Sequence, residues 1–454
     1  MKSRESAAAR PRPVRLVQHG LFSARLLRSG RGAVLLITGV IVLGINMRAA
    51  ITSLPPVFPE LESALHLSAG TLSLLAAIPV LCFGVFSGAG APLSRRFGEE
   101  RVLGIALALL AAGLVLRGVS PRILLFPGTV IAGAAIALLN VLLPSLVKRR
   151  MPERAGLIIG LYLLMLSAGA IVASALAVPV FNAAGGGTSG SASVRIALGL
   201  WAAPAVLAAA LWLPQLKYRT VPDGAARPQT VPAAGVLPGE GRAASTRPAG
   251  ALAMGRSALA WQVTLFMGLQ SLSYYATLSW FPTMFRERGV SAVHAGDLLA
   301  LMNLGNAVTC LLIPVLAHRA ADQRKLAVAA VVATAAGVAG AVLGPAALAP
   351  EFIAVLGLGQ GSTLGLAVFY TMARAPDPAS AASLSAFAQG AGYLLASIGP
   401  LTIGFLHDAS GSWALPGVVL LGVAAAQLIC GWLAGRALTV PGAMLRRARP
   451  LPQE

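Results

Sequence analysis

Long apolar runs alternate with short polar segments along most of this chain. Each run holds roughly 20 residues, and a helix of that length rises about 30 Å, which is enough to cross the hydrocarbon of a bilayer. The pattern therefore predicts an all-α polytopic membrane protein with twelve transmembrane helices. The predicted spans are residues 33–52, 70–90, 102–118, 123–147, 155–181, 194–213, 258–285, 293–316, 325–345, 351–373, 380–406 and 414–436.

Composition and charge agree with a membrane protein. Hydrophobic residues make up 57% of the 454 positions and charged residues 11%, whereas a soluble domain has about 25% charged residues. The net charge of +20 does not indicate a nucleic-acid partner, because the basic residues lie in short clusters between the apolar runs. With the N-terminus inside, the cytoplasmic segments hold 29 of the 35 basic residues, which predicts that both termini are cytoplasmic. The predicted outer loops hold five: Arg117, Arg122, Arg195, Arg286 and Arg288.

One stretch interrupts the alternation of runs. Residues 214–256 carry six prolines and six glycines, with no aromatic residue after Tyr218. Such a stretch cannot bury enough apolar surface to fold, so we expect a flexible cytoplasmic linker. The predicted organisation is a basic cytoplasmic tail at 1–32, a six-helix half at 33–213, the linker at 214–256, a second six-helix half at 257–436, and a cytoplasmic tail at 437–454.

The two predicted halves resemble each other. Residues 93–103, after the second span, align with residues 316–326, after the eighth, at an offset of 223. Residues 151–155 align with residues 375–379 at an offset of 224. Two loops that agree on nearly one offset indicate a tandem repeat of six spans. Parallel repeats with a binding site between them near the midplane are the architecture of secondary transporters that work by rocking.

The first predicted span contains two polar side chains, Asn46 and Arg48. A charged side chain within the bilayer costs roughly 2.5–3.5 kcal/mol on insertion scales, so it is normally paired, buried in protein or functional. We expect Arg48 and Asn46 to point into a central cavity, where Arg48 is an anion-binding residue or a coupling residue. The alternative is an arginine that reaches outward to the periplasmic interface.

Other polar residues in apolar spans are candidates to line the same path. Gln270 is close to the repeat position of Asn46, and Tyr274 lies one turn later, on the same helix face. Each amide could instead act as a polar link between helices, and each tyrosine could belong to packing or to the interfacial aromatic belt. The candidates of second rank are Asn140, Tyr162, Gln360, Gln389 and Tyr393.

Acidic residues are absent from the middle of the predicted spans, and Asp297, early in the eighth, is the nearest. Proton coupling usually needs a buried ionisable group, so Asp297 or Glu60 is the candidate coupling residue, unless the substrate carries the proton. An arginine with so few acids around it favours an anionic, weakly acidic or neutral polar substrate over a cation. A loop after the second span is expected to set topology and hold the cytoplasmic ends together, with a gating role as the alternative; its residues are Arg95, Arg96, Gly98, Glu99 and Arg101.

No motif for catalysis or cofactor binding is present. The sequence contains no nucleotide-binding P-loop and no nucleophile with a matched base, and its five histidines have no metal-ligand spacing. We therefore expect neither an enzyme nor a cofactor or metal requirement.

Several segments resemble the major facilitator superfamily, and more narrowly its branch of cyanate and 2-nitroimidazole transporters. Residues 46–53 read Asn-Met-Arg-Ala-Ala-Ile-Thr-Ser, where the branch usually has Asn-Leu-Arg-Pro-Ala-Ile-Thr-Ser. The similarity covers about residues 33–436, and Ser94 departs from it where the superfamily usually has an acid. The other matching segments are 140–144, 160–162, 261–271, 357–361 and 388–396.

The resemblance implies a secondary active transporter of the bacterial inner membrane that works by alternating access. Its expected substrate is a small polar or anionic solute of the cyanate or nitroimidazole kind, with protons as a candidate coupling ion. A single chain with both halves is complete in principle, so a monomer is expected. A proton-coupled exporter of lipophilic drugs is the alternative within transport. A membrane sensor or scaffold is the alternative of another class.

Overall fold

The computed structural model describes residues 30–185, 190–217 and 251–440. Within these ranges the chain is helical, with α-helices and short 3-10 helices and no strand. The predicted terminal tails and most of the predicted linker lie outside the described residues. The parts of the linker that are described are two short 3-10 helices, Leu213–Lys217 and Ala251–Arg256.

The N-terminal half contains nine α-helices in the described residues, which cover the first six predicted spans and the segments between them. They are α2 (Gly30–Thr52), α3 (Phe58–Leu65), α4 (Ala69–Phe86), α5 (Gly90–Phe97), α6 (Glu99–Val119), α7 (Pro121–Arg150), α8 (Ala155–Ala183), α9 (Gly190–Gly199) and α10 (Ala202–Trp212). The C-terminal half contains α11 (Ala258–Glu287), α12 (Ala292–Arg319), α13 (Arg324–Leu343), α14 (Ala349–Ala373), α15 (Pro378–Ala396), α16 (Ile398–Ser410) and α17 (Ala414–Ala434).

Every predicted span coincides with a helix or with a pair of consecutive helices. Ten helical segments of the described chain are long and apolar enough to cross a membrane. The other two predicted spans are α11, which carries many polar residues, and the interrupted pair α15 and α16. The breaks between α9 and α10 and between α15 and α16 are each followed by a proline in the first turn of the next helix, Pro204 and Pro400, which has no N–H to donate to the carbonyl four residues earlier.

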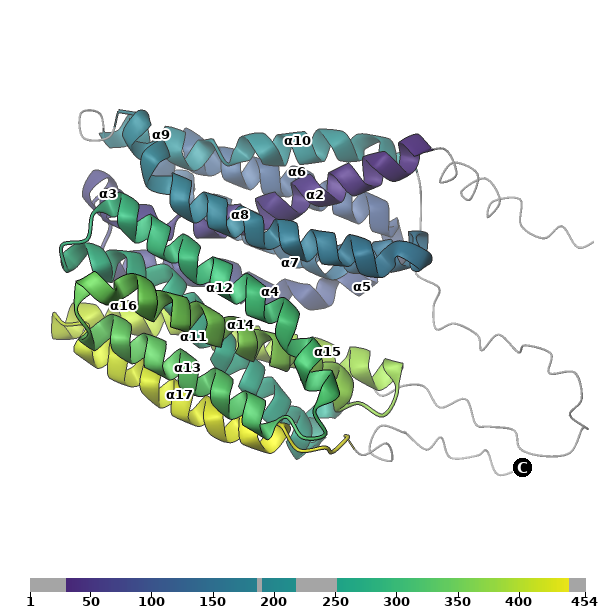
Figure 1. Ribbon diagram of the computed structural model, residues 1–454. Helices are drawn as coiled ribbons and strands as arrows, with labels where there is room; N and C mark the ends of the chain where they lie inside the picture. The colour runs from purple at the N-terminus through teal and green to yellow at the C-terminus, as the bar shows by residue number, and fades with distance from the viewer. Residues whose placement is uncertain (1–29, 186–189, 218–250, 441–454) are drawn as a thin grey trace, which may run out of the picture.

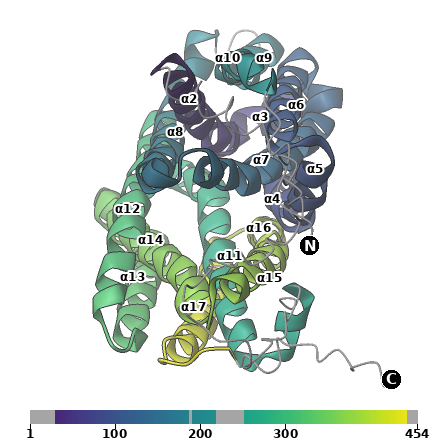
Figure 2. The ribbon, with the colours of Figure 1, turned by 90° about the vertical axis from the view of Figure 1, so that its right-hand side faces the viewer.

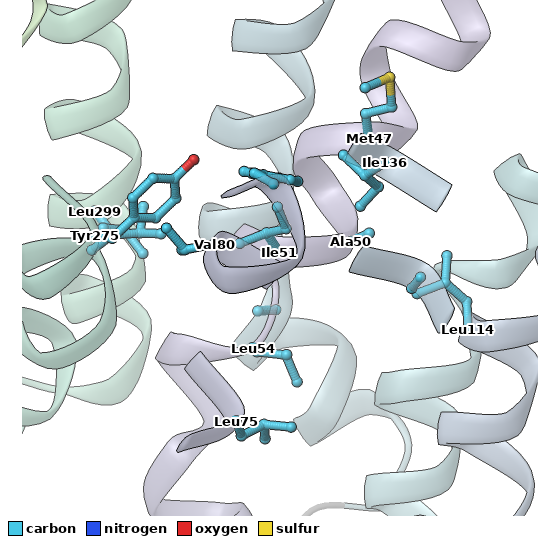
Figure 3. Close-up of a cluster of buried hydrophobic side chains, with 14 of the residues drawn as sticks. Met47, Ala50, Ile51, Leu54, Leu75, Val80, Leu114, Ile136, Tyr275 and Leu299 are labelled. Carbon is cyan, nitrogen blue, oxygen red and sulfur yellow. The ribbon is translucent and has the colours of Figure 1, made fainter. Parts of the chain in front are cut away.

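The helices form two bundles that lie against each other along their length (Figure 1). Viewed from the end at which α2 begins and α17 ends, the N-terminal half lies above the C-terminal half (Figure 2). We call this the terminal end and the opposite end the far end. Figure 3 shows Tyr275 and Leu299 of the C-terminal half beside Val80 and Ile51 of the N-terminal half, and all four belong to one buried cluster that joins the halves.

Buried arginines cap the C-termini of neighbouring helices. The last carbonyls of a helix lack intrahelical donors and carry partial negative charge, so a cation there is favourable. Arg117 of α6 donates to the carbonyl of Ala50 at 2.9 Å, near the end of α2. The assignment of Arg117 to an outer loop was therefore wrong, because its side chain is 3% exposed and is held inside the N-terminal half. Arg374 likewise donates to the carbonyls of Ala434 and Gly435, at the end of α17.

The predicted repeat extends to matched side-chain pairs. Glu100 at the start of α6 forms an ion pair with Arg150, at the end of α7. Residues displaced by 223 and 224 positions are Gln323 and Arg374, and these two side chains also form a hydrogen bond. An arginine thus bonds to a side chain at the equivalent helix end in both halves, through an ion pair in one and a neutral hydrogen bond in the other, as expected of a duplicated six-helix unit.

Candidate functional site

Arg48 lies where the two halves meet. It is on α2, and its Nη1 donates to the hydroxyl of Tyr275 on α11, at 3.4 Å. Its guanidinium carbon lies 5.4 Å from the centre of the Tyr274 ring, within the range of a cation–π contact. Two helices from different halves therefore hold a partly buried cation against two adjacent aromatic rings, as predicted for Arg48 and Tyr274.

Tyr274 extends this contact into a chain of hydrogen bonds. Its hydroxyl donates to Oδ1 of Asn303 on α12 at 2.7 Å. The Nδ2 of Asn303 lies 3.4 Å from Oγ of Ser174, on α8. These contacts start at α2, pass through α11 and α12 of the C-terminal half and end at α8. A displacement of Arg48 would therefore disturb contacts among four helices from both halves.

Four tyrosines lie in the neighbourhood of the guanidinium, and two of them contact it. Besides Tyr274 and Tyr275, Tyr393 of α15 and Tyr162 of α8 lie close enough to interact with Arg48 electrostatically. The hydroxyl of Tyr162 donates to Oδ1 of Asn140, on α7, at 3.0 Å. The ring of Tyr393 packs edge-on against Phe83 of α4, with centroids 5.5 Å apart. Four of the chain's six tyrosines therefore contribute to an aromatic candidate site that is rich in hydroxyl groups.

The charge of Arg48 has no carboxylate partner among the described residues. The ion pairs of this part of the chain join other residues. Glu60, one predicted coupling residue, pairs with Arg286. Asp297, the other, is exposed on the second turn of α12. The site is thus positively charged and lined by neutral groups.

Four of the predicted site residues form no hydrogen bond with Arg48. Asn46 is fully buried without a hydrogen-bond partner, and residues two apart on a helix point to different sides. Gln270 is buried, and its Oε1 accepts from Ser271. Gln389 donates to Ser385 on its own helix. Gln360 donates to Thr277 of α11 at 2.9 Å and so links two helices of the C-terminal half.

The predicted gate loop connects helix ends within the N-terminal half. Gly98 joins α5 to α6 with a φ of +88°, which favours glycine. Glu99 is buried, accepts from Ser145 of α7 at 2.8 Å and lies 3.6 Å from Arg149. The three arginines of the loop are exposed: Arg95, Arg96 and Arg101. The buried acid of this loop therefore joins α6 to α7, in agreement with the expectation that the loop holds helix ends together.

The halves also make contact at the far end. Arg286, in the last turn of α11, pairs with Glu60 of α3 at 2.8 Å and donates to the carbonyl of Pro56 at 3.3 Å. One turn and a half earlier, Trp280 packs edge-on against Phe58, with centroids 5.9 Å apart. Arg48 and its tyrosines thus lie on the terminal side of a layer that joins the two halves.

Several residues of the site were not among the leading predictions. Tyr275 provides the hydrogen bond to Arg48, and Asn303 and Ser174 continue the chain. Two features of the sequence could have indicated them: the adjacent Tyr274 and Tyr275 in a span rich in polar residues, and the amide of Asn303 in the eighth span. Ser174 has no signal, because a serine in a helix usually bonds to its own backbone, as this one does to Ala170.

Comparisons with known proteins agree with this architecture. The sequence profile of the Major Facilitator Superfamily matches residues 34–400. The 2-nitroimidazole transporter of Escherichia coli is 37% identical over 412 residues, which are 90% of this chain and 97% of that protein. The cyanate transport protein CynX of Escherichia coli is 30% identical over 389 residues, 85% of this chain and 94% of that protein. The crystal structure of the nucleoside transporter NupG has a TM-score of 0.67 at 12% identity, and the match covers 88% of this chain and 98% of that one.

The family and these relatives identify a secondary transporter, which moves a small solute through a membrane, and the two helical halves agree with that class. The chain belongs to the Major Facilitator Superfamily. The family and the relatives are transporters and not enzymes. Within the described residues, no group of three His, Cys, Asp or Glu side chains could hold a metal ion.

Proposed function

We propose that this protein carries a small planar anion or weak acid, of the cyanate or nitroimidazole kind, by alternating access. The observation that carries the proposal is Arg48, a cation without a carboxylate partner among the described residues, which contacts Tyr274 and Tyr275 at the junction of the halves. The two relatives that transport cyanate and 2-nitroimidazole support the same class of substrate.

The chemistry of the site favours a flat, negatively charged solute. A guanidinium presents several N–H donors in one plane, which match two acceptors of a planar anion. The rings of Tyr274 and Tyr275 meet at 76°, so they offer one face and one edge to a flat ligand. A cation would be repelled by Arg48, and a bulky lipophilic solute would leave the guanidinium without an anionic partner.

We further propose that the terminal end faces the cytoplasm of a bacterial cell and that the protein functions as a monomer in the inner membrane. The excess of basic residues in the segments at the terminal end supports this orientation. Arg286, Glu60 and the layer beneath them then form an outer gate, and Arg48 would be reached from the cytoplasm. Whether a proton accompanies the substrate depends on the substrate itself, because Glu60 is paired and Asp297 is exposed.

Uptake into proteoliposomes tests the proposed function. Purified protein is reconstituted, and entry of labelled cyanate or 2-nitroimidazole is measured with and without a pH gradient. Saturable uptake of either solute, competed by small planar anions and not by organic cations, is the expected result. Transport of bulky lipophilic cations with control by Asp297 would contradict it and support the drug exporter instead.

The pair of Arg286 and Glu60 predicts a charge-dependent outer gate. Replacing Glu60 by arginine should break the pair, repel Arg286 and open the outer side. The readout is reaction of a cysteine placed at Ser279, which is 2% exposed, with an impermeant thiol reagent added outside, in a cysteine-free background. We expect a several-fold faster reaction in Glu60→Arg and in Arg286→Glu. The double variant, which restores opposite charges, should return to the original rate, and equal rates in all four proteins would refute the gate.

Tyr274 is expected to contribute to binding through both its hydroxyl and its ring. Tyr274→Phe removes the hydrogen bond to Asn303 and keeps the ring over Arg48, which should weaken cyanate binding by roughly fivefold, or about 1 kcal/mol. Tyr274→Leu also removes the cation–π contact and should cost about tenfold more. The KM for uptake separates the two, and equal KM values for the Phe and Leu variants would exclude a role for the ring.

A further inference from the structure

The charge of Arg48 has a consequence for the transport cycle. Arg48 touches the hydroxyl of Tyr275 and the ring of Tyr274, and both are neutral. Glu60, the acid at the far end of the interface, is already paired with Arg286. Among the described residues, no internal carboxylate is in place to neutralise Arg48 when the substrate leaves.

Alternating access requires that the site be closed to both sides at an intermediate stage. Arg48 is already partly buried, and closing the site without a substrate removes the remaining water from a guanidinium that has no counter-charge, which is strongly unfavourable. Closing it with a monoanion bound encloses a neutral pair instead. The cation–π contact with Tyr274 stabilises the charge but does not neutralise it. The loaded protein should therefore change conformation much faster than the empty one.

We propose that this transporter is an anion exchanger, which returns across the membrane quickly only with a second monoanion in the site. The inference rests on the proposed function, because it requires an anionic substrate at Arg48. The counter-substrate is a small monoanion that presents at least one acceptor to the guanidinium, and it includes the substrate itself. Net transport of an anion, in which the protein returns without a bound anion, is then the slow process.

Exchange and net transport can be measured in the same preparation. Proteoliposomes are loaded with unlabelled cyanate or with an impermeant buffer, the membrane potential is held at zero with potassium and valinomycin, and entry of labelled cyanate is followed. We expect initial uptake into cyanate-loaded vesicles to be at least tenfold faster, which corresponds to about 1.4 kcal/mol in barrier height. The exchange rate should also be independent of an imposed potential, since no net charge moves.

A built-in counterion provides the decisive variant. Tyr275→Glu places a carboxylate opposite Arg48, and Tyr275→Gln is the neutral control of the same shape. The glutamate should bring the ratio of exchange to net uptake close to one and weaken cyanate binding, whereas the glutamine should keep the ratio high.

The outcomes separate the two proposals. Saturable cyanate uptake with equal rates into loaded and empty vesicles would overturn exchange and leave the proposed function standing. A ratio that stays high in Tyr275→Glu would also overturn it, because the charge of Arg48 would not be its cause. No uptake in either kind of vesicle, from protein that unfolds cooperatively on heating, would reject the proposed function and exchange with it.

Discussion

Replacement of Arg48 by alanine is expected to lower substrate uptake at least about 100-fold without lowering the stability of the protein. Loss of a charged hydrogen-bonding partner for the anion accounts for about 3 kcal/mol. Stability should be unchanged or higher, because Arg48 is partly buried without an ion pair in the described chain, and its removal relieves a desolvation penalty. Binding sites commonly keep residues that lower the stability of the protein because function requires them.

Two further variants make this prediction specific. Arg48→Lys keeps the charge but loses the planar array of donors, so uptake should fall only about tenfold. Arg319→Ala removes an exposed arginine at the end of α12 and should transport as the wild type does. The measurements are initial uptake into proteoliposomes and thermal unfolding in detergent. Normal uptake by Arg48→Ala would show that Arg48 is an interfacial anchor and would move the binding site to α11.

The fold was accessible from the sequence because hydrophobicity must match the bilayer. Spans such as 155–181 and 414–436 follow from length alone, and the helices there end within two residues of the prediction. The breaks after Leu200 and Ala396 were missed, since hydropathy does not register a lost backbone donor. Arg117 was misplaced for a related reason: a basic residue near a span end looks like a loop residue, although its side chain can cap a neighbouring helix.

The site was accessible only in part. Arg48 was found because a charge in an apolar span demands an explanation, and Tyr274 because it shares a helix with other polar residues. Asn46 and Gln270 were expected beside them, but rotation about the helix axis and local hydrogen bonds decide where an amide points. Their roles in binding stay predictions. The contact between Arg48 and Tyr275 joins residues that are 227 positions apart, and a local sequence pattern cannot predict such a contact.

The close approach of α2 to α8 carries the second large prediction. Gly169 of α8 lies against the backbone of Ile45, and a Cβ added there would come within 2.0 Å of that carbonyl oxygen. A carbon and an oxygen normally stay about 3.3 Å apart or more, so Gly169→Ala must push α2 away by about 1 Å. Ile45 is three residues before Arg48 on the same helix, and Thr52 on the next turn bonds to the carbonyl of Ala170. The displacement therefore reaches the proposed binding site around Arg48.

We expect Gly169→Ala to destabilise the protein by about 1–3 kcal/mol through overpacking and to reduce transport by about 100-fold through misplacement of Arg48. Gly160→Ala is the matched control, because it makes the same change in the same helix with nothing within 4 Å of the new Cβ. That variant should be as stable as the wild type or slightly more, since alanine is the better helix former. Thermal unfolding and uptake are measured for both. If the two glycine variants behaved alike, α2 would not be held against α8 at Gly169, and the position of Arg48 would have to depend on the contacts with α11 alone.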